Sequence, residues 1–209
     1  NPFTARTRSR NFAIVLMIAE LGVREAEPLV LKSQHVNLAG RSPSISIVPN
    51  PNDPDERRKD PPLVKTYGRQ LPISAVLASA LDGYILGARR EAPGHKRNPF
   101  IFLDTAAGNA LSIDALYDIF QVLRRRFREQ LPSDLSPHKL RHTWNTRFRR
   151  ITKKSGWTEP QRRTINNFIM GWAKTSQQDT RYASSEIQSE ATKALEALHI
   201  QLTSEVGAA

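Results

Sequence analysis

The stretch that decides the fold begins Ser136-Pro137-His138-Lys139-Leu140-Arg141-His142-Thr143-Trp144. Ser136 is a suitable N-cap and Pro137 suits the first helical position, so we expect a helix to begin just before His138. His138 and Arg141 are three residues apart and share one face of such a helix. Together they could hold a phosphate, because backbone N–H groups and the helix dipole favour an anion at a helix N-terminus.

The same stretch continues through a basic linker to Met170-Gly171-Trp172 and ends with Gln177-Gln178-Asp179-Thr180-Arg181-Tyr182-Ala183. A tyrosine therefore follows the histidine and arginine after a short segment that contains a tryptophan. A histidine, an arginine and a tyrosine are all residue types that can take part in chemistry at a phosphate.

The overall charge of the chain agrees with a phosphate-containing partner. The 209 residues carry a formal net charge of +11, which points to a polyanion. Aromatic residues lie among the positive clusters and favour a nucleic acid, although a generally basic protein without such a partner is the simpler alternative. There is no cysteine, so disulfides and cysteine zinc sites are excluded, which is consistent with a reducing cytosol. We also expect no metal site, because the histidines are scattered.

The sequence contains no apolar run of transmembrane length and no recognisable signal peptide. It begins Asn1-Pro2-Phe3 without an initiator methionine, which is compatible with a fragment of a longer protein. We expect no internal repeat.

The N-terminal part predicts a buried helix followed by a charged turn. Asn11–Leu21 is apolar on almost every side and Gly22 is a natural stop. A shorter helix is expected from Arg24 to Lys32. Arg24 directly follows the buried helix, so it points either into a pocket or simply to the surface, as most arginines at helix junctions do.

The middle of the chain predicts the β structure. We expect short strands between residues 34 and 48, including Ser44–Val48, and a hairpin over Leu63–Ile73 with its turn at Tyr67-Gly68. The proline-rich segment 49–62 between them is predicted to be an exposed loop. Lys65 lies in the hairpin, where a lysine is normally a solvated edge residue.

Further helices are predicted over Ser74–Arg89, Ser112–Leu131, Gln161–Gly171 and, after a short helix that carries Tyr182, Glu186–Val206. Arginines and lysines cluster at the end of the predicted helix Ser112–Leu131 and after the His138 stretch. These clusters either are solvated or contact DNA phosphates with a strong salt dependence. The candidates for DNA binding are Arg124, Arg125, Arg147, Arg150, Lys153 and Lys154.

These motifs together resemble the catalytic domain of the tyrosine recombinases, the phage integrase family. The segment from His138 to Thr143 resembles the family's His-x-x-Arg box. Gly22-Val23-Arg24, with Glu27 and Leu31, resembles its first arginine box, and Lys65-Thr66-Tyr67-Gly68 before Leu71-Pro72-Ile73 resembles its lysine hairpin. The resemblance covers roughly residues 11–183. It implies a mainly α fold with a small antiparallel β-sheet.

The resemblance also implies roles for individual residues. The catalytic set would be Arg24, Lys65, His138, Arg141, Trp172 and Tyr182, with Glu27 orienting active-site groups; Lys59 and Arg69 are less favoured in place of Lys65. Tyr182 would attack the DNA phosphate and form a 3′-phosphotyrosyl link, without a metal or any other cofactor. Most family members have a histidine where this chain has Trp172, so packing and one indole N–H would replace a titrating group there.

The same resemblance sets the expected domains and partners. Residues 1–185 would form the catalytic domain and residues 186–209 a helical tail that packs either on its own chain or on a neighbouring subunit. We expect the N-terminal DNA-clamping domain of the family to be absent from these 209 residues. The partners would be double-stranded DNA and sister subunits, as a tetramer on paired sites, in the cytoplasm at the nucleoid of a bacterium, phage or mobile element.

Two other functions fit part of the sequence. A type IB topoisomerase uses the same kinds of residues, although the contexts of Arg24 and His138 look more like those of integrases. A non-catalytic DNA-binding module would explain the charge but not the full set of catalytic positions.

Overall fold

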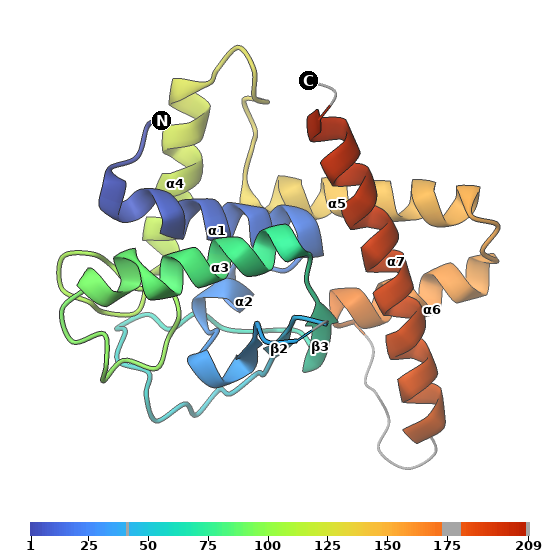
Figure 1. The fold of residues 1–209 in the computed structure, drawn as a ribbon, viewed down its shortest axis with the longest axis horizontal. Coiled ribbons are helices and arrows are strands. Elements are labelled where there is room, and N and C mark those ends of the chain that lie inside the picture. Colours follow the sequence, from blue (N-terminus) through green and yellow to red (C-terminus); the bar gives the residue numbers. More distant parts are fainter. Residues whose placement is uncertain (41, 173–180, 208–209) are drawn as a thin grey trace.

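A computed structural model of the chain describes residues 1–40, 42–172 and 181–207, and their side chains except in 181–186 and 201–207 (Figure 1). Its helices are α1 (Ala5–Leu21), α2 (Ala26–Leu29), α3 (Ala75–Leu86), α4 (Ile113–Arg126), α5 (Pro137–Lys154), α6 (Glu159–Met170) and α7 (Arg181–Gly207), with short 3-10 turns η1 (Ser33–His35) and η2 (Ala88–Glu91). Its strands are β1 (Val36–Asn37), β2 (Ser44–Ile47) and β3 (Arg69–Pro72). The predicted class, mainly α with a small antiparallel sheet, is confirmed.

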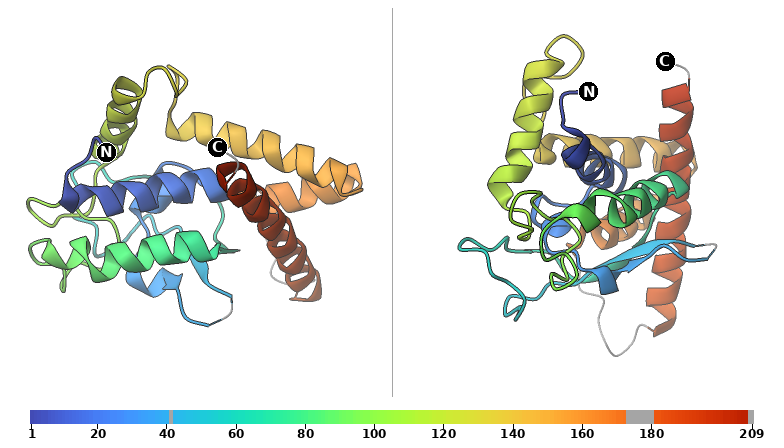
Figure 2. Two further views of the ribbon diagram at one scale, coloured as in Figure 1. Left: turned by 45° about the horizontal axis from the view of Figure 1, so that its top comes forward. Right: turned by 60° about the vertical axis from the view of Figure 1, so that its left-hand side comes forward.

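Helix α1 lies at the centre of the molecule, and its apolar sequence explains why. It packs against α3 on one side and α5 on another, as the two views of Figure 2 show. Ile14, Met17, Ile18 and Leu21 are completely buried, which matches an apolar surface on almost every side of the helix. The helix begins at Ala5, earlier than the predicted Asn11, because the first turn is polar and carries no apolar signal.

Side-chain caps fix the starts of four helices. The hydroxyl groups of Ser74, Ser112, Ser136 and Thr158 each accept a hydrogen bond from the backbone N–H group three residues later, as capping requires. The predicted start of the His138 helix is therefore confirmed. The linker predicted after it is wrong in its first half, since α5 continues to Lys154.

The sheet differs from the predicted hairpin. The strands are ordered β1-β2-β3, all antiparallel, and Ile45 pairs with Leu71 across β2 and β3. The strand of the predicted hairpin before Tyr67-Gly68 does not form, and residues 63–68 are outside any strand. The reason is that their polar groups bond elsewhere: the backbone N–H of Tyr67 donates to the carbonyl of Gly171 at 3.0 Å, and the Thr66 hydroxyl donates to Glu27.

One further prediction needs correction in this half of the chain. The helix predicted from Arg24 to Lys32 is reduced to α2, because Lys32 forms a bridge with Phe100 instead. On α3, Leu77, Leu81 and Tyr84 are buried, whereas Val76 is 47% exposed.

The proline-rich loop 49–62 is anchored more firmly than its sequence predicts. The Lys32 amine bonds to Asp53 at 2.5 Å and to Asp55 at 2.7 Å. The guanidinium of Arg58 donates to the carbonyl groups of Leu29 at 3.1 Å and Leu111 at 2.7 Å. These contacts hold the loop against α2 and the start of α4.

Helix α7 joins two predicted elements into one. The expected short helix around Tyr182 and the expected helix Glu186–Val206 form a single helix that begins at Arg181, so the proposed domain boundary at residue 185 falls inside it. It crosses α5 and α6 and packs on both (Figure 1). Ala191, Ala194, Leu195 and Leu198 are buried in the common core, so in this structure the tail packs on its own chain.

Candidate active site

A hollow of about 340 Å³ opens between α5, the end of α6 and the turn after α1. Four of the residues predicted to be catalytic line it together, although they come from distant parts of the sequence. The residues around it are Arg24, Glu25, His138, Arg141, His142, Asn145, Met170 and Trp172.

Arg141 lies at the floor of this hollow and is held by two helix ends. Its guanidinium donates to the carbonyl of Gly22 at 2.5 Å and to the carbonyl of Met170 at 3.0 Å. These carbonyl groups lie at the C-terminal ends of α1 and α6, where the helix dipoles favour a cation. The side chain is therefore fixed in position before any substrate arrives.

The charge of Arg141 is only partly compensated. The residue is 7% exposed, and no carboxylate forms an ion pair with it among the residues that the structure describes. Burial lowers the pKa of Arg141 to about 10; Glu27 opposes this shift, whereas Arg69 and Arg24 add to it. At neutral pH the group remains a cation, and a buried cation without a direct counter-ion favours an anionic ligand.

Gly22 allows the close packing beneath Arg141. Its φ is +61°, a conformation that favours glycine, and a Cβ here would lie 2.7 Å from the ring of Trp144. Trp144 is buried and donates its indole N–H to the carbonyl of Glu20 at 2.8 Å. The glycine before Arg24 and the tryptophan after Arg141 are thus parts of one packing arrangement.

Glu27 forms the buried polar centre next to the hollow. It forms an ion pair with Arg69, whose Nη1 lies 2.8 Å from Oε1, and it accepts hydrogen bonds from the Thr66 hydroxyl and, at 2.7 Å, the Arg24 backbone N–H. Burial raises the pKa of Glu27, but the Arg69 charge and these hydrogen bonds outweigh burial, so the pKa lies below its ordinary value. Glu27 is therefore an ionised buried group that ties the turn of Arg24 to the segment of Lys65.

Arg24 and Trp172 face the hollow in different ways. Arg24 is half-buried, and within residues 1–40, 42–172 and 181–207 its side chain makes no hydrogen bond or ion pair. Trp172 is 46% exposed, and its ring lies 5.6 Å from the guanidinium carbon of Arg141, a separation typical of a cation–π contact. Arg24 thus keeps its guanidinium donors available, whereas Trp172 covers one side of Arg141.

Lys65 is not among the described residues that line the hollow. Lys65 is exposed, but it directly precedes Thr66 and Tyr67, whose bonds to Glu27 and Gly171 hold this segment beside the site. Tyr182 lies on the first turn of α7, and its side chain lies outside the described part of the chain. Residues 173–180 also lie outside it.

The predicted DNA-binding residues divide into two groups. Arg147 and Arg150 line a second hollow on α5, Lys153 lines a third between α5 and α6, and Arg125 and Lys154 are exposed near the helix ends. Arg124 is different, because its Nη1 donates to the carbonyl of Leu135 at 2.7 Å and its side chain is half-buried. Arg124 thus supports the loop after α4, and its contact with DNA stays a prediction.

The sequence analysis missed several residues of the site. His142 and Asn145 lie one and two helical turns beyond His138 on the same face of α5, so helical spacing could have found both. Arg69 was weighed only as an alternative to Lys65, yet it is a buried partner of Glu27. A strand places Arg69 on the same side as the buried Leu71, and this alternation was a usable signal.

Among the described residues, no group of three or more histidine, aspartate or glutamate side chains has the arrangement of a metal site. No helix in the described ranges is long and apolar enough to cross a bilayer.

Comparison with known proteins identifies the fold. No family model matches the chain, and no curated protein matches its sequence. Among solved structures, the chain is similar to the XerH site-specific recombinase bound to difH substrate in a pre-cleavage complex, with 21% identity, a TM-score of 0.57 and 90% of this chain covered. It is also similar to XerA recombinase, with 20% identity, a TM-score of 0.55 and 94% covered. A third similar structure is the Tn1549 transposon integrase in complex with transposon right end DNA, with 18% identity, a TM-score of 0.53 and 86% covered.

The chain spans 44% of the XerH chain, 57% of XerA and 58% of the Tn1549 integrase. The chain thus has the catalytic-domain fold of the tyrosine recombinases. The fold named from the sequence motifs is confirmed by these structural similarities.

Proposed function

We propose that this chain is the catalytic domain of a site-specific DNA recombinase that cleaves and rejoins DNA strands through a 3′-phosphotyrosyl intermediate. The observation that carries the proposal is the hollow in which Arg24, His138, Arg141 and Trp172 meet. Two guanidinium groups and an imidazole around one hollow are suited to a phosphodiester, and similar recombinases were solved with bound DNA.

The two arginines would bind the nonbridging oxygens of the scissile phosphate. Arg141 is preorganised by its two backbone carbonyl acceptors, so little rearrangement is needed when the phosphate binds. Negative charge grows on these oxygens during attack at phosphorus, and fixed donors stabilise that charge more strongly than mobile water does.

The remaining groups would move protons and electrons as follows. The Tyr182 hydroxyl oxygen attacks phosphorus and forms the Oη–P bond, while the bond from phosphorus to the 5′-oxygen breaks. His138 accepts the tyrosine proton, which is needed because a free tyrosine has a pKa of about 10. Lys65 gives a proton to the leaving 5′-oxygen, and Trp172 packs beside the phosphate and offers one N–H. A 5′-hydroxyl from another strand reverses these steps and completes rejoining.

The proposed partners follow from the same chemistry. Double-stranded DNA is the substrate, and strand exchange between paired sites requires sister subunits, as a tetramer in the full-length protein. The net charge of +11 supports binding to a polyanion.

The test of the proposed function lets the protein select its own target site. The protein is incubated with a pool of nicked duplexes that carry a randomised segment, and the strands that remain attached after denaturation are recovered and sequenced. We expect a covalent adduct on a defined sequence with the wild-type protein and none with Tyr182→Phe. Absence of an adduct with the wild-type protein would leave only a DNA-binding module.

A type IB topoisomerase is the second candidate, since the same residues serve its chemistry. Relaxation of a supercoiled plasmid that lacks the selected sequence would favour the topoisomerase. We expect cleavage to require the selected sequence.

A further inference from the structure

His142 is a histidine of the site that the proposed mechanism leaves without a task. It lies one helical turn after His138 on α5, and the two rings meet edge to face with their centres 4.5 Å apart. Both side chains are exposed and both line the hollow with Arg24 and Arg141. An imidazole in this position can reach a bound DNA strand.

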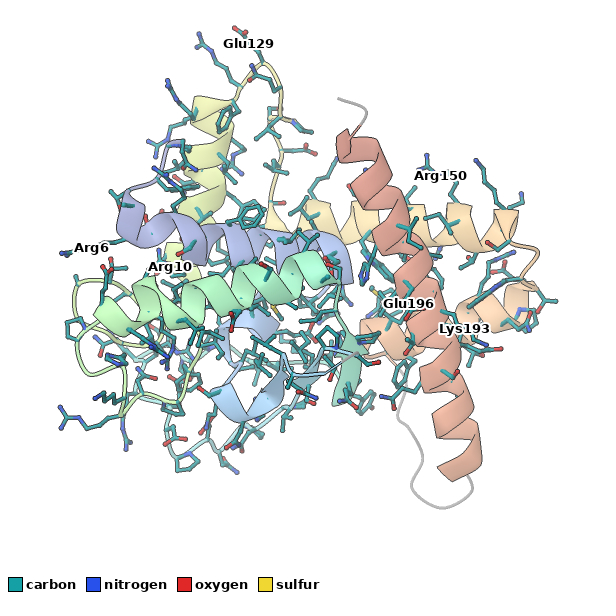
Figure 3. All side chains as sticks on the ribbon, viewed as in Figure 1. Arg6, Arg10, Glu129, Arg150, Lys193 and Glu196 are labelled. Carbon is teal, nitrogen blue, oxygen red and sulfur yellow. The ribbon has the colours of Figure 1, made fainter. Side chains whose placement is uncertain are left out.

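His142 also lines a second hollow of about 700 Å³ on α5. Its other lining residues are Lys139, Thr143, Thr146, Arg147 and Arg150. Figure 3 shows Arg150 projecting outward from α5. His142 therefore lies on the ridge that separates the candidate active site from the basic second hollow beside it.

Several neighbours of His142 in the second hollow already have hydrogen-bond partners. The Thr143 hydroxyl donates to the carbonyl of Lys139 at 3.0 Å, and the Thr146 hydroxyl donates to the carbonyl of His142 at 3.1 Å. The Lys139 amine lies 2.7 Å from Asp134.

The ring nitrogens of His142, in contrast, make no hydrogen bond to any residue that the structure describes. An imidazole offers at least one N–H donor in either protonation state, so this donor is available at the ridge.

We propose that His142 donates a hydrogen bond to the DNA phosphate next to the scissile one and thereby places the scissile phosphate between Arg24 and Arg141. The inference rests on the proposed function. Four residues of an α-helix rise by about 6 Å, which is close to the separation of neighbouring phosphates along a DNA strand. With the scissile phosphate at His138, the next phosphate of the strand then lies at His142, and the backbone continues toward Arg147.

His142 acts in this scheme as a positioning residue that works through the substrate. Because Trp172 cannot titrate and contributes a single N–H, the His142 contact supplies the additional donor that aligns the strand. Misalignment slows the chemical step even when every catalytic group is present.

The test uses the cleavage sequence recovered from the nicked-duplex selection. Two substrates are made, each with a neutral methylphosphonate at one of the two phosphates that flank the scissile phosphate. The rate of adduct formation on each substrate is measured with the wild-type protein and with His142→Ala. We expect the substitution His142→Ala to slow cleavage by about ten- to a hundredfold, the range for a hydrogen bond to a charged group. At one flanking phosphate the neutral link should slow the wild-type protein similarly but leave His142→Ala without a further loss.

Two control variants make the result specific. His142→Gln keeps an N–H donor and should recover part of the lost rate. His95→Ala makes the same chemical change in a half-buried histidine of the loop after η2 and should cleave like the wild-type protein. Because His142 is exposed, His142→Ala should unfold at the same denaturant concentration as the wild-type protein.

Each outcome separates the inference from the function on which it rests. No adduct with wild-type protein overturns the proposed function. Normal cleavage by His142→Ala overturns only the role of His142. The role of His142 is also overturned if, at both flanking phosphates, the rate loss from His142→Ala and the rate loss from the neutral link multiply. Independent losses of this kind exclude a direct contact between His142 and either phosphate.

Discussion

Arg69 and Glu27 form a buried ion pair that joins β3 to α2. The Nη1 and Oε1 atoms are 2.8 Å apart, and the side chains are 1% and 0% exposed. The Nε of Arg69 also donates to the carbonyl of Ile169 at 2.6 Å. One pair of charges thus links the segments that carry Arg24, Lys65 and Trp172, and the geometry of the site depends on it.

Removal of one member of this pair should destabilise the whole domain. Arg69→Met leaves the Glu27 carboxylate buried without its counter-ion, for which a loss of about 3–5 kcal/mol in the free energy of unfolding is typical. The matched control is Arg6→Met, because Arg6 and Glu91 are 3.8 Å apart and mostly exposed, and such pairs contribute less than about 1 kcal/mol. Urea unfolding measures both. Equal losses in the two variants would show that the buried pair has no special importance.

The same pair should make stability depend on pH in a defined window. The pKa of Glu27 lies below its ordinary value of 4.5, so above that value the ionised carboxylate contributes its full stabilisation. As the pH falls below 4.5 toward the lower folded-state pKa, the unfolded chain binds the proton first and this contribution is lost.

The reference for this pH effect is the double variant Glu27→Gln/Arg69→Met, which has no titrating group at position 27. Unfolding free energies should decrease more steeply between neutral and acidic pH in the wild-type protein than in the double variant, because all other carboxylates are common to both. Parallel curves would contradict the assignment.

The sequence predicted the parts of this site that depend on local signals. Ser136 and Pro137 place the start of α5, and Gly22 places the end of α1; both follow from capping rules that act over a few residues. The positions of Arg24, His138, Arg141 and Trp172 followed from local motifs, and the fold brings all of these residues to one hollow.

Long-range polar contacts were beyond the reach of those signals. The predicted hairpin is wrong because Thr66 and Tyr67 bond to Glu27 and Gly171, which lie far away in the sequence. Turn propensity does not register such competition, since a hairpin and an anchored loop have the same local residues. The anchoring of loop 49–62 by Arg58 escaped prediction for the same reason.

DNA affinity should reveal which arginines meet phosphates. Arg147→Ala and Arg150→Ala should each reduce the slope of log Kd against log salt by about one, since each contact displaces about one counter-ion. A short duplex of arbitrary sequence is sufficient, because phosphate contacts do not depend on sequence. Anisotropy titrations over a range of salt concentrations give the slopes, and an unchanged slope would remove that residue from the DNA surface.

Arg124 provides the contrast on α4. Its guanidinium donates to the carbonyl of Leu135, so Arg124→Ala should lower the free energy of unfolding by about 1 kcal/mol, the usual contribution of one hydrogen bond, and leave the salt slope unchanged. A reduced slope without a loss of stability would instead show that Arg124 contacts DNA.

Lys65 should act only on the leaving group. Lys65→Ala should slow cleavage by about a hundredfold or more, the range for a general acid. A substrate with sulfur in place of the bridging 5′-oxygen leaves as a thiolate, whose conjugate acid has a pKa of about 8.5, and therefore needs no proton. This substrate should restore cleavage to Lys65→Ala but not to Arg141→Ala. If the sulfur substrate does not restore cleavage to Lys65→Ala, Lys65 is not the general acid, and another group protonates the leaving 5′-oxygen.

The last prediction concerns which subunit supplies the tyrosine. Tyr182 follows Trp172 by ten residues and lies in the first turn of a helix whose buried residues, including Ala191 and Leu195, pack on the same chain. Both facts favour attack by Tyr182 within its own subunit. Mixtures of Tyr182→Phe and Arg141→Ala subunits on half-sites should then form no adduct, because each subunit lacks one essential group.

In this mixing experiment, restored cleavage would require the tyrosine of the Arg141→Ala subunit to enter the intact pocket of its neighbour. That exchange would have to release α7 from α5 and α6 and expose its buried alanine and leucine side chains. Exposure of this apolar surface opposes exchange unless a neighbouring subunit covers it equally well. Shortening of α7 after His199 leaves the described buried side chains of α7 in place. Attack by Tyr182 within its own subunit should therefore survive this change, whereas an exchange that depends on the removed end should not.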